Sequence, residues 1–112
     1  MDSLAPRQSK KLCKKAIKSF MDVLVLPEIE KGSLSGYDII QTINDTFGVV
    51  LSPSVVYGSL YSMEREGLLK SSVRGRARTY ELTTKGKENL PFMSRANEEL
   101  KNFITGISSI ET

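Results

Sequence analysis

The chain has 112 residues and a formal net charge of +3, which suits one domain and excludes a lobed enzyme with a deep cleft. With no histidine and a single cysteine, the sequence excludes zinc sites and histidine-based nucleophilic triads. It also has no glycine-rich phosphate loop, so we expect neither enzymatic activity nor a cofactor.

Cysteine content and hydropathy point to an intracellular protein. The lone Cys13 cannot form an intramolecular disulfide, and no apolar run approaches the roughly 20 residues that span a bilayer. No secretory leader is recognisable. We expect a cytoplasmic, nucleoid-associated protein with no membrane partner.

Basic residues gather in two zones that flank a nearly neutral middle. This distribution is typical of a protein that binds an anionic polymer. The first zone comprises Arg7, Lys10, Lys11, Lys14, Lys15 and Lys18, and the second comprises Lys70, Arg74, Arg76, Arg78, Lys85 and Lys87.

The first predicted helix covers residues 9–31, where apolar residues recur at helical spacing. Pro27 should kink this helix or restart it, because proline lacks the amide donor that a helix interior needs. Its lysines either form a solvated face or contact DNA, and their charge opposes the helix macrodipole. Packing is favoured over redox sensing for Cys13. The apolar stripe comprises Cys13, Ile17, Phe20 and Leu24.

A second helix is predicted after the glycine-rich stretch at residues 32–36. Ser35 should cap its N-terminus, and Gly48 should end it. Ile40, Ile43 and Phe47 are predicted on its inner face.

A third helix is predicted between Ser52 and Gly67. Ser52 can cap free amides with its oxygen, and Pro53 suits the first helical turn. The opposite face has no carboxylate near its N-terminal end, which suits insertion into a groove lined by phosphates. The predicted buried stripe is Val56, Leu60 and Met63; the opposite face comprises Ser54, Val55, Gly58, Tyr61, Ser62 and Arg65.

A hairpin is predicted over residues 69–82, with its turn at Gly75. Arg74, Arg76 and Arg78 surround that turn, and three like charges repel one another unless an anion offsets them. This favours contact with phosphates or a minor groove over a solvated hairpin tip. Arg78 could instead pair with a carboxylate of its own domain.

The last helical region should begin with a cap at Thr83 or Thr84. Because Pro91 is tolerated only in a first turn, the long helix should begin near Leu90, after a short helical turn. Apolar residues then recur at spacings of 3 and 4, as in a coiled-coil seam, although packing on the helix's own domain is an alternative. The predicted dimer interface comprises Cys13, Ile17, Phe20, Met93, Ala96, Leu100, Phe103, Ile104, Ile107 and Ile110.

This order of elements predicts a fold of the α+β class that is mostly α. It is a winged helix-turn-helix with a two-stranded wing and a C-terminal dimerisation helix. We expect a flexible N-terminus at residues 1–8, a winged-helix DNA-binding domain at 9–88 and the dimerisation helix at 89–112.

Three segments resemble, in order and spacing, the motifs of PadR-like transcriptional regulators: LSGYDII (34–40), SPSVVYGSLYSMEREGLL (52–69) and RARTYELTTKGKENL (76–90). The resemblance covers about residues 24–90, and the length is similar to that of the subgroup with one C-terminal helix. It implies a homodimeric repressor that binds double-stranded DNA at a pseudo-palindromic operator. The third helix would enter the major groove, and the wing tip would reach the backbone or an adjacent minor groove.

Matched motif to motif, Ser54, Tyr57 and Tyr61 become groove-side positions and the three hairpin arginines become wing positions. Partial burial is the alternative for Tyr57. The chain departs from the family pattern at Gly58, where proline is frequent, and in its lysine-rich N-terminal extension. Some relatives respond to phenolic or multidrug-like compounds, which leaves a small-molecule effector open but identifies no pocket.

Two other functions fit the same pattern of elements. An architectural protein would coat DNA with little sequence preference. A protein-interaction module would use the winged helix and the C-terminal seam to contact other proteins.

Overall fold

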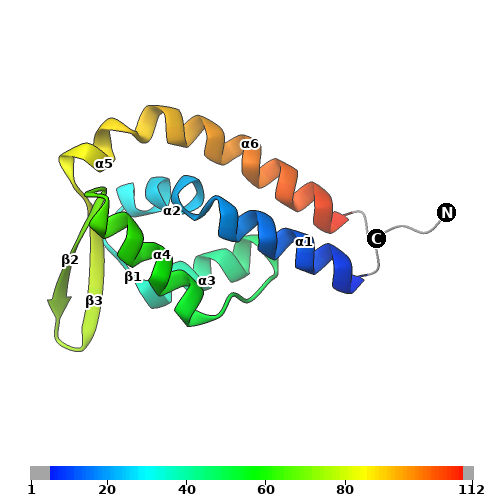
Figure 1. The fold of residues 1–112 in the computed structure, drawn as a ribbon, viewed down its shortest axis with the longest axis horizontal. Coiled ribbons are helices and arrows are strands. Elements are labelled where there is room, and N and C mark those ends of the chain that lie inside the picture. Colours follow the sequence, from blue (N-terminus) through cyan, green and yellow to red (C-terminus); the bar gives the residue numbers. More distant parts are fainter. Residues whose placement is uncertain (1–5, 110–112) are drawn as a thin grey trace.

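The computed structural model describes residues 6–109 (Figure 1). The predicted α+β plan, with helices predominating, is confirmed. Helix α1 begins at Pro6, so part of the predicted flexible N-terminus is helical, and residues 1–5 lie outside the described range. The elements are α1 (Pro6–Ser19), α2 (Met21–Glu30), β1 (Leu34–Ser35), α3 (Gly36–Phe47), α4 (Pro53–Arg65), β2 (Leu69–Arg74), β3 (Ala77–Leu82), α5 (Thr84–Glu88) and α6 (Leu90–Ser109).

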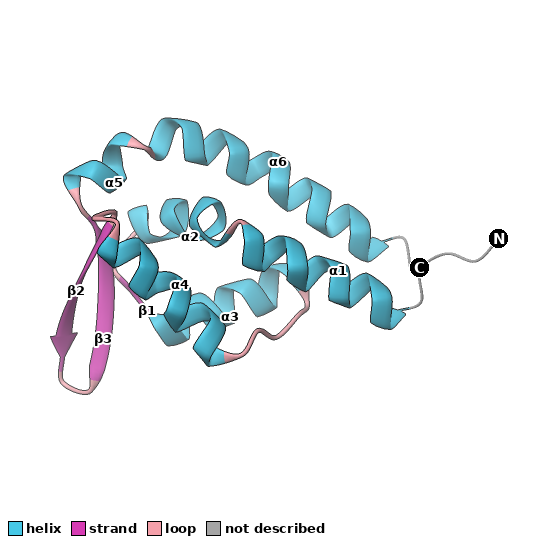
Figure 2. Ribbon diagram, in the orientation of Figure 1, coloured by secondary structure: helices cyan, strands magenta, loops and turns pink. Residues whose placement is uncertain are grey.

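The strands form one antiparallel sheet in the order β1-β3-β2 (Figure 2). Strands β2 and β3 make the predicted wing hairpin, in a register that pairs Leu69 with Leu82 and Arg74 with Ala77. Strand β1 pairs Leu34 with Tyr80 on the other edge of β3. Sequence reasoning missed β1, because two residues are too few to show strand alternation.

The predicted restart at Pro27 was wrong: the helix is interrupted at Phe20, and Pro27 is buried inside α2. Phe20 leaves helical geometry with φ −126° and ψ 35°. Proline 27 cannot donate to the carbonyl of Val23, four residues earlier. Asn97 of α6 supplies that donor, because its Nδ2 lies 2.9 Å from the Val23 oxygen and 3.3 Å from the Leu24 oxygen.

Helix α3 is closed at its N-terminus by a reciprocal capping box. Ser35 Oγ accepts from the Asp38 amide, and Asp38 Oδ2 accepts from the Ser35 amide, both at 3.1 Å. Of the predicted inner face, Ile43 and Phe47 are buried and Ile40 is half-buried against the core, whereas the buried Ile39 was missed. The buried apolar residues of this helix recur every four positions and comprise Ile39, Ile43 and Phe47.

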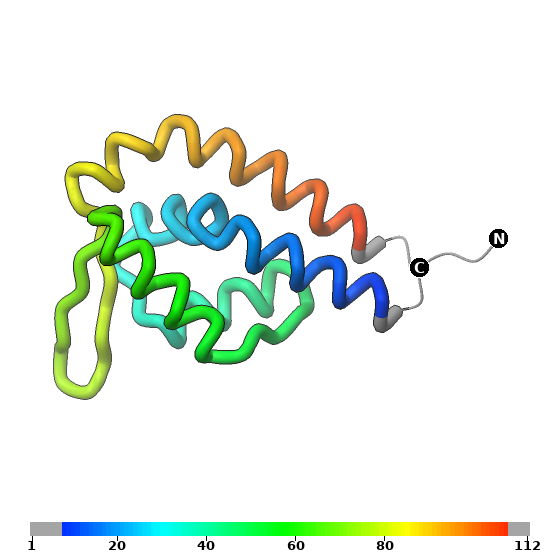
Figure 3. The backbone as a smooth tube through the Cα atoms, viewed as in Figure 1, coloured from blue at the N-terminus to red at the C-terminus, as the bar shows by residue number. Residues whose placement is uncertain are grey.

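Helix α6 runs back along α2 and α1, opposite α3 and α4 (Figure 3). It begins at Leu90 after the short helix α5, as the position of Pro91 predicts. Thr83 is the cap of α5: its Oγ1 accepts from the Gly86 amide at 3.0 Å. Within residues 6–109, no helix combines the length and apolar character needed to cross a membrane.

The core lies between α6, the helices α1, α2, α3 and α4, and the inner side of the sheet. The predicted stripe of α4 is confirmed, since all three of its residues are buried. The most completely buried large side chains are Ile17, Leu26, Ile39, Leu60, Leu69 and Ile104.

Candidate nucleic-acid interface

Helix α4 begins at Pro53, but the predicted side-chain cap by Ser52 was wrong. Ser52 Oγ lies 3.3 Å from Ser54 Oγ and caps no amide. The Ser52 carbonyl accepts from the amides of Val55 and Val56, at 3.1 and 3.3 Å. No acidic residue lies in the first turn, so the partial positive charge of this helix end is not offset there. The arrangement suits an anion such as a phosphate.

Most of the predicted outer face of α4 is exposed. Val55 is the exception, because it is half-buried and packs against the core. The Arg65 guanidinium carbon lies 5.7 Å from the centroid of the Tyr61 ring, which is the range of a cation–π contact. Tyr61 itself is 61% exposed, so the face presents an aromatic ring, a guanidinium and hydroxyls. The exposed positions are Ser54, Gly58, Tyr61, Ser62 and Arg65.

Tyr57 lies at the edge of this face and packs against α3. A methyl group on Gly36 would lie 2.2 Å from Tyr57 Cε1 and 2.7 Å from its hydroxyl oxygen. Only glycine allows the ring to approach the backbone so closely. The Tyr57 side chain is still 41% exposed, so both the partial burial and the groove-side position foreseen for it are compatible with the structure.

The wing turn consists of Gly75 and Arg76. Gly75 has φ 64°, a left-handed conformation that glycine adopts without strain, and the turn joins the pair Arg74 and Ala77. Arg74 and Arg76 are exposed, and within the part of the chain that the structure describes neither has an ion pair. The tip projects away from α6 (Figure 3).

Arg78 differs from the other wing arginines because it contacts its own domain. Its Nη1 donates to Ser71 Oγ at 2.8 Å, and Ser71 Oγ donates to Glu64 Oε2 at 2.7 Å. The foreseen pairing of Arg78 with a carboxylate is not formed among the described residues, because the Ser71 hydroxyl stands between its guanidinium and the Glu64 carboxylate. This relay joins β3, β2 and α4. Sequence reasoning missed Ser71 and Glu64, since only the folded hairpin brings Ser71 of β2 beside Glu64 of α4.

Tyr80 lies buried beneath this relay. Burial raises the pKa of the Tyr80 phenol, and the nearby positive charge of Arg78 acts in the opposite direction. Tyr80 is thus a neutral member of the core beneath the wing. Within residues 6–109, no group of His, Cys, Asp and Glu side chains could hold a metal ion.

The predicted dimer residues that the structure describes fall into two groups. Cys13, Ile17, Ile104 and Ile107 are buried within the monomer, and Cys13 Sγ contacts the Ile104 carbonyl oxygen at 3.7 Å. These four therefore have little surface to offer a partner. Ile110 lies outside the described residues. The remaining positions are half-buried or exposed and comprise Phe20, Met93, Ala96, Leu100 and Phe103.

An apolar groove runs between α2 and α6, and we call it the α2–α6 groove. Phe92 and Phe103 are 77% and 62% exposed on its α6 side. Its lining comprises Phe20, Val23, Phe92, Ala96, Glu99, Leu100 and Phe103.

Residues 25–91 match the model of the transcriptional regulator PadR-like family. The fold is similar to that of a PadR-like transcriptional regulator from Bacillus cereus, with 18% identity, a TM-score of 0.67 and coverage of 83% of this chain and 95% of that one. A PadR family transcription regulator from Clostridium difficile has 24% identity and a TM-score of 0.63, with coverage of 78% and 96%. Bacillus subtilis PadR, solved in complex with operator DNA, has 28% identity and a TM-score of 0.54, with coverage of 64% and 44%. No curated protein matches the chain significantly.

Proposed function

Because the chain belongs to the PadR-like family of transcriptional regulators, we propose that it represses transcription by binding a pseudo-palindromic DNA operator as a homodimer. One observation carries this proposal: the outer face of α4 is exposed apart from Val55, contains no carboxylate and lies beside an arginine-tipped wing. The similarity to Bacillus subtilis PadR, whose structure contains operator DNA, supports the same assignment.

Helix α4 would enter the major groove with Tyr61 and Arg65 toward the base edges. Arginine can donate two hydrogen bonds to guanine, which gives sequence discrimination. Ser54 and Ser62 would donate to phosphate oxygens, contacts that fix the register of the protein on DNA. Glu64, which would repel phosphates, is directed to the wing by its hydrogen bond with Ser71.

The wing would follow the backbone beside the groove occupied by α4. Arg74 and Arg76 are exposed and have no ion pair among the described residues, so each is free to neutralise a phosphate. Arg78 would act through Ser71 and hold the wing against α4. Two of the three predicted wing contacts are therefore retained as phosphate contacts.

A second copy of the chain would cover the α2–α6 groove. An exposed apolar strip along a helix is typical of an association surface. Leu100 and Phe103 would lie at the centre of this interface. A small-molecule effector that bound in the same groove could alter the dimer. Two-fold symmetry would then set the spacing of two half-sites on DNA at about one helical turn. As a chromosome-bound repressor, the protein would associate with the nucleoid.

Selection of bound fragments from the organism's own genomic DNA, followed by binding curves, tests this proposal. The selected duplex and a scrambled duplex are titrated at several salt concentrations. Specific regulators bind their sites roughly a thousandfold or more tighter than random DNA. Equal affinity for both duplexes would contradict the proposal and favour an architectural role. Absence of DNA binding at low salt would favour a protein-interaction module.

A further inference from the structure

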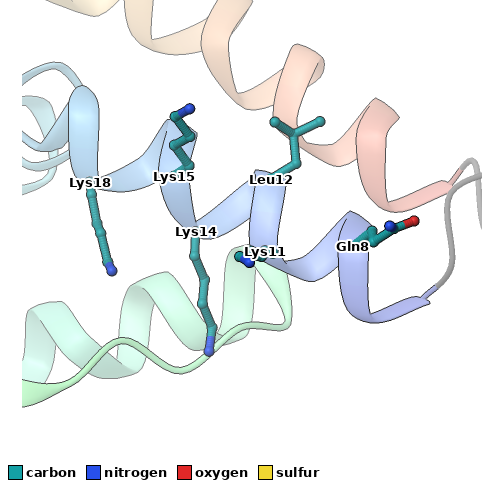
Figure 4. Close-up of a pocket in the computed structure, with 6 residues that line it drawn as sticks. All are labelled: Gln8, Lys11, Leu12, Lys14, Lys15 and Lys18. Atoms are coloured by element: carbon teal, nitrogen blue, oxygen red, sulfur yellow. The ribbon is translucent and has the colours of Figure 1, made fainter.

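Helix α1 has two chemically distinct sides. One side packs on α6 through Cys13 and Ile17, and Ser9 Oγ donates to the Ile107 carbonyl oxygen at 3.3 Å. The other side lines an open concavity with long cationic side chains (Figure 4). Its lining comprises Gln8, Lys11, Leu12, Lys14, Lys15 and Lys18.

The charge of this helix is of one sign. Its sequence PRQSKKLCKKAIKS contains one arginine, five lysines and no carboxylate. Lysines three and four positions apart are neighbours on a helix, so they repel one another. Those near the N-terminal end also oppose the helix macrodipole. A helix selected only for solubility would carry acidic residues among its lysines.

Within residues 6–109, none of these lysines has an ion-pair partner. The described ion pairs join Lys31 and Lys101 to Glu28, and Lys70 to Glu81. The α1 lysines are thus available to an external anion, unlike the cations elsewhere that are already paired. Four of them are exposed and Lys14 is half-buried.

Two of the lysines, Lys14 and Lys18, lie on the side of the molecule that carries the wing tip, whereas Lys15 extends toward α6 (Figure 4). Figure 4 shows Lys14 and Lys18 extending away from α6, toward the connection between α3 and α4. The wing tip also lies away from α6, at the other end of the long axis, and α4 begins between α1 and the wing along that axis (Figure 1). The longest dimension of 50 Å corresponds to roughly 15 base pairs at about 3.4 Å each.

We propose that the lysine side of α1 is a second DNA-backbone contact, which binds phosphates flanking the segment that α4 and the wing contact. This inference rests on the proposed DNA-binding function and extends its footprint along the duplex. A duplex fits better than an anionic membrane, because membrane-bound helices present several large apolar residues beside their lysines. Here Leu12 is the large apolar residue in the concavity, and Cys13 and Ile17 are buried.

The test compares two double variants of the full chain. Lys14→Gln with Lys18→Gln removes two cations from α1. The matched control, Lys31→Gln with Arg95→Gln, removes two exposed cations that lie outside both basic zones. Both variants lower the net charge by two, so the long-range electrostatic attraction between the protein and DNA decreases equally in both. Thermal unfolding without DNA checks that each variant is folded.

Binding to a mixed-sequence duplex of about 40 base pairs is measured between about 50 and 200 mM salt. Each lost phosphate contact lowers the slope of log affinity against log salt by about 0.9, so the α1 variant should lose about 2 in slope. The control should keep the wild-type slope. Equal slopes in the α1 variant and the control would overturn the proposal.

Two further measurements separate this proposal from its alternatives. The duplex has mixed sequence, so the slope comparison does not require an operator. If the wild-type protein shows no preference for an operator, the proposed regulator function is refuted, but the slope comparison still tests the α1 contact. Phosphatidylserine vesicles serve as the second probe. If the α1 variant loses binding to vesicles but keeps the wild-type slope on DNA, the surface is a lipid contact and the proposal is wrong.

Discussion

At the scale of single residues, Arg76 and Arg78 differ in what they already bind. Arg76 is exposed in the wing turn, whereas Arg78 donates to Ser71 within the relay to Glu64. We predict that Arg76→Ala weakens binding to all sequences and reduces the salt slope by about 1. Arg78→Ala should leave the slope unchanged and lower stability by about 1 kcal/mol, as one hydrogen bond is lost.

Salt-dependent binding and urea unfolding of the two variants provide the measurement. Ser71→Ala serves as a companion to Arg78→Ala, because it breaks the same relay without removing a charge. If Arg78→Ala reduced the salt slope as much as Arg76→Ala, Arg78 would be a phosphate contact and the relay would not define its role.

Asn97 compensates for a specific defect that Pro27 introduces into α2. Its side chain is 3% exposed and donates to the Val23 carbonyl, which proline leaves without a helical donor. We predict that Asn97→Ala lowers the free energy of unfolding by about 1–3 kcal/mol, because a buried carbonyl loses its partner. Urea unfolding measures the loss.

A double-mutant cycle with Pro27→Ala makes this test specific. An alanine at that position restores the amide donor, so Asn97→Ala should cost less in that background. Asn102→Ala, at an exposed position of α6, is the control. An equal loss with and without Pro27 would show that Asn97 stabilises the chain for another reason.

At the scale of elements, α4 contains a glycine where helical stability alone would favour another residue. No heavy atom lies within 4 Å of a methyl group built on Gly58, and the position is exposed. We predict that Gly58→Ala raises stability by about 0.5–1 kcal/mol. It should also weaken operator binding, because the added methyl would occupy the surface proposed to lie against DNA.

Urea unfolding and operator titration measure the two effects separately. Gly36→Ala is the informative comparison, since its methyl would collide with Tyr57 and should destabilise the fold. A stabilised Gly58→Ala variant with wild-type affinity would show that this part of α4 does not approach DNA closely.

Elements whose limits depend on local signals could be predicted from the sequence. The start of α4 at Pro53, the wing turn at Gly75 and the start of α6 at Leu90 all match. The break at Phe20 was not predicted because no proline or glycine marks it, and strand β1 was not predicted because it depends on pairing with the distant strand β3. The predicted restart at Pro27 did not occur, and the compensating donor comes from Asn97, 74 residues from the carbonyl that it binds.

The candidate site was predictable to a similar degree. Helical geometry alone separated the buried stripe of α4 from its outer face, apart from Val55. Arg78 and Tyr57 contact residues of other elements. The sequence alone therefore could not decide, for either residue, between a contact with DNA and a contact within the domain. The apolar stripes of α1 and α6 could not be divided into core and surface, because Cys13 and Ile104 pack on each other within one chain.

At the scale of the whole molecule, the α2–α6 groove is the surface proposed to join two copies. We predict that Leu100→Glu with Phe103→Glu gives a monomer whose operator affinity is lower by about 100-fold or more, because two half-sites are no longer bound together. Light scattering and operator titration test both parts. Asn102→Glu with Thr105→Glu adds the same charge at exposed positions of α6 and should remain dimeric. A dimeric Leu100/Phe103 variant would exclude this groove as the interface.

The most direct test of the central claim is a hydroxyl-radical footprint of the protein on a selected operator. If two copies each place α4 in a major groove, protection should appear as two symmetric patches on one face of the duplex. Their centres should be about 10 base pairs apart, the spacing of one helical turn. Arg76→Ala should reduce protection at the edges, where the wings contact the backbone. Uniform protection along the duplex, or a single short patch, would contradict binding by a dimer through α4 and the wing.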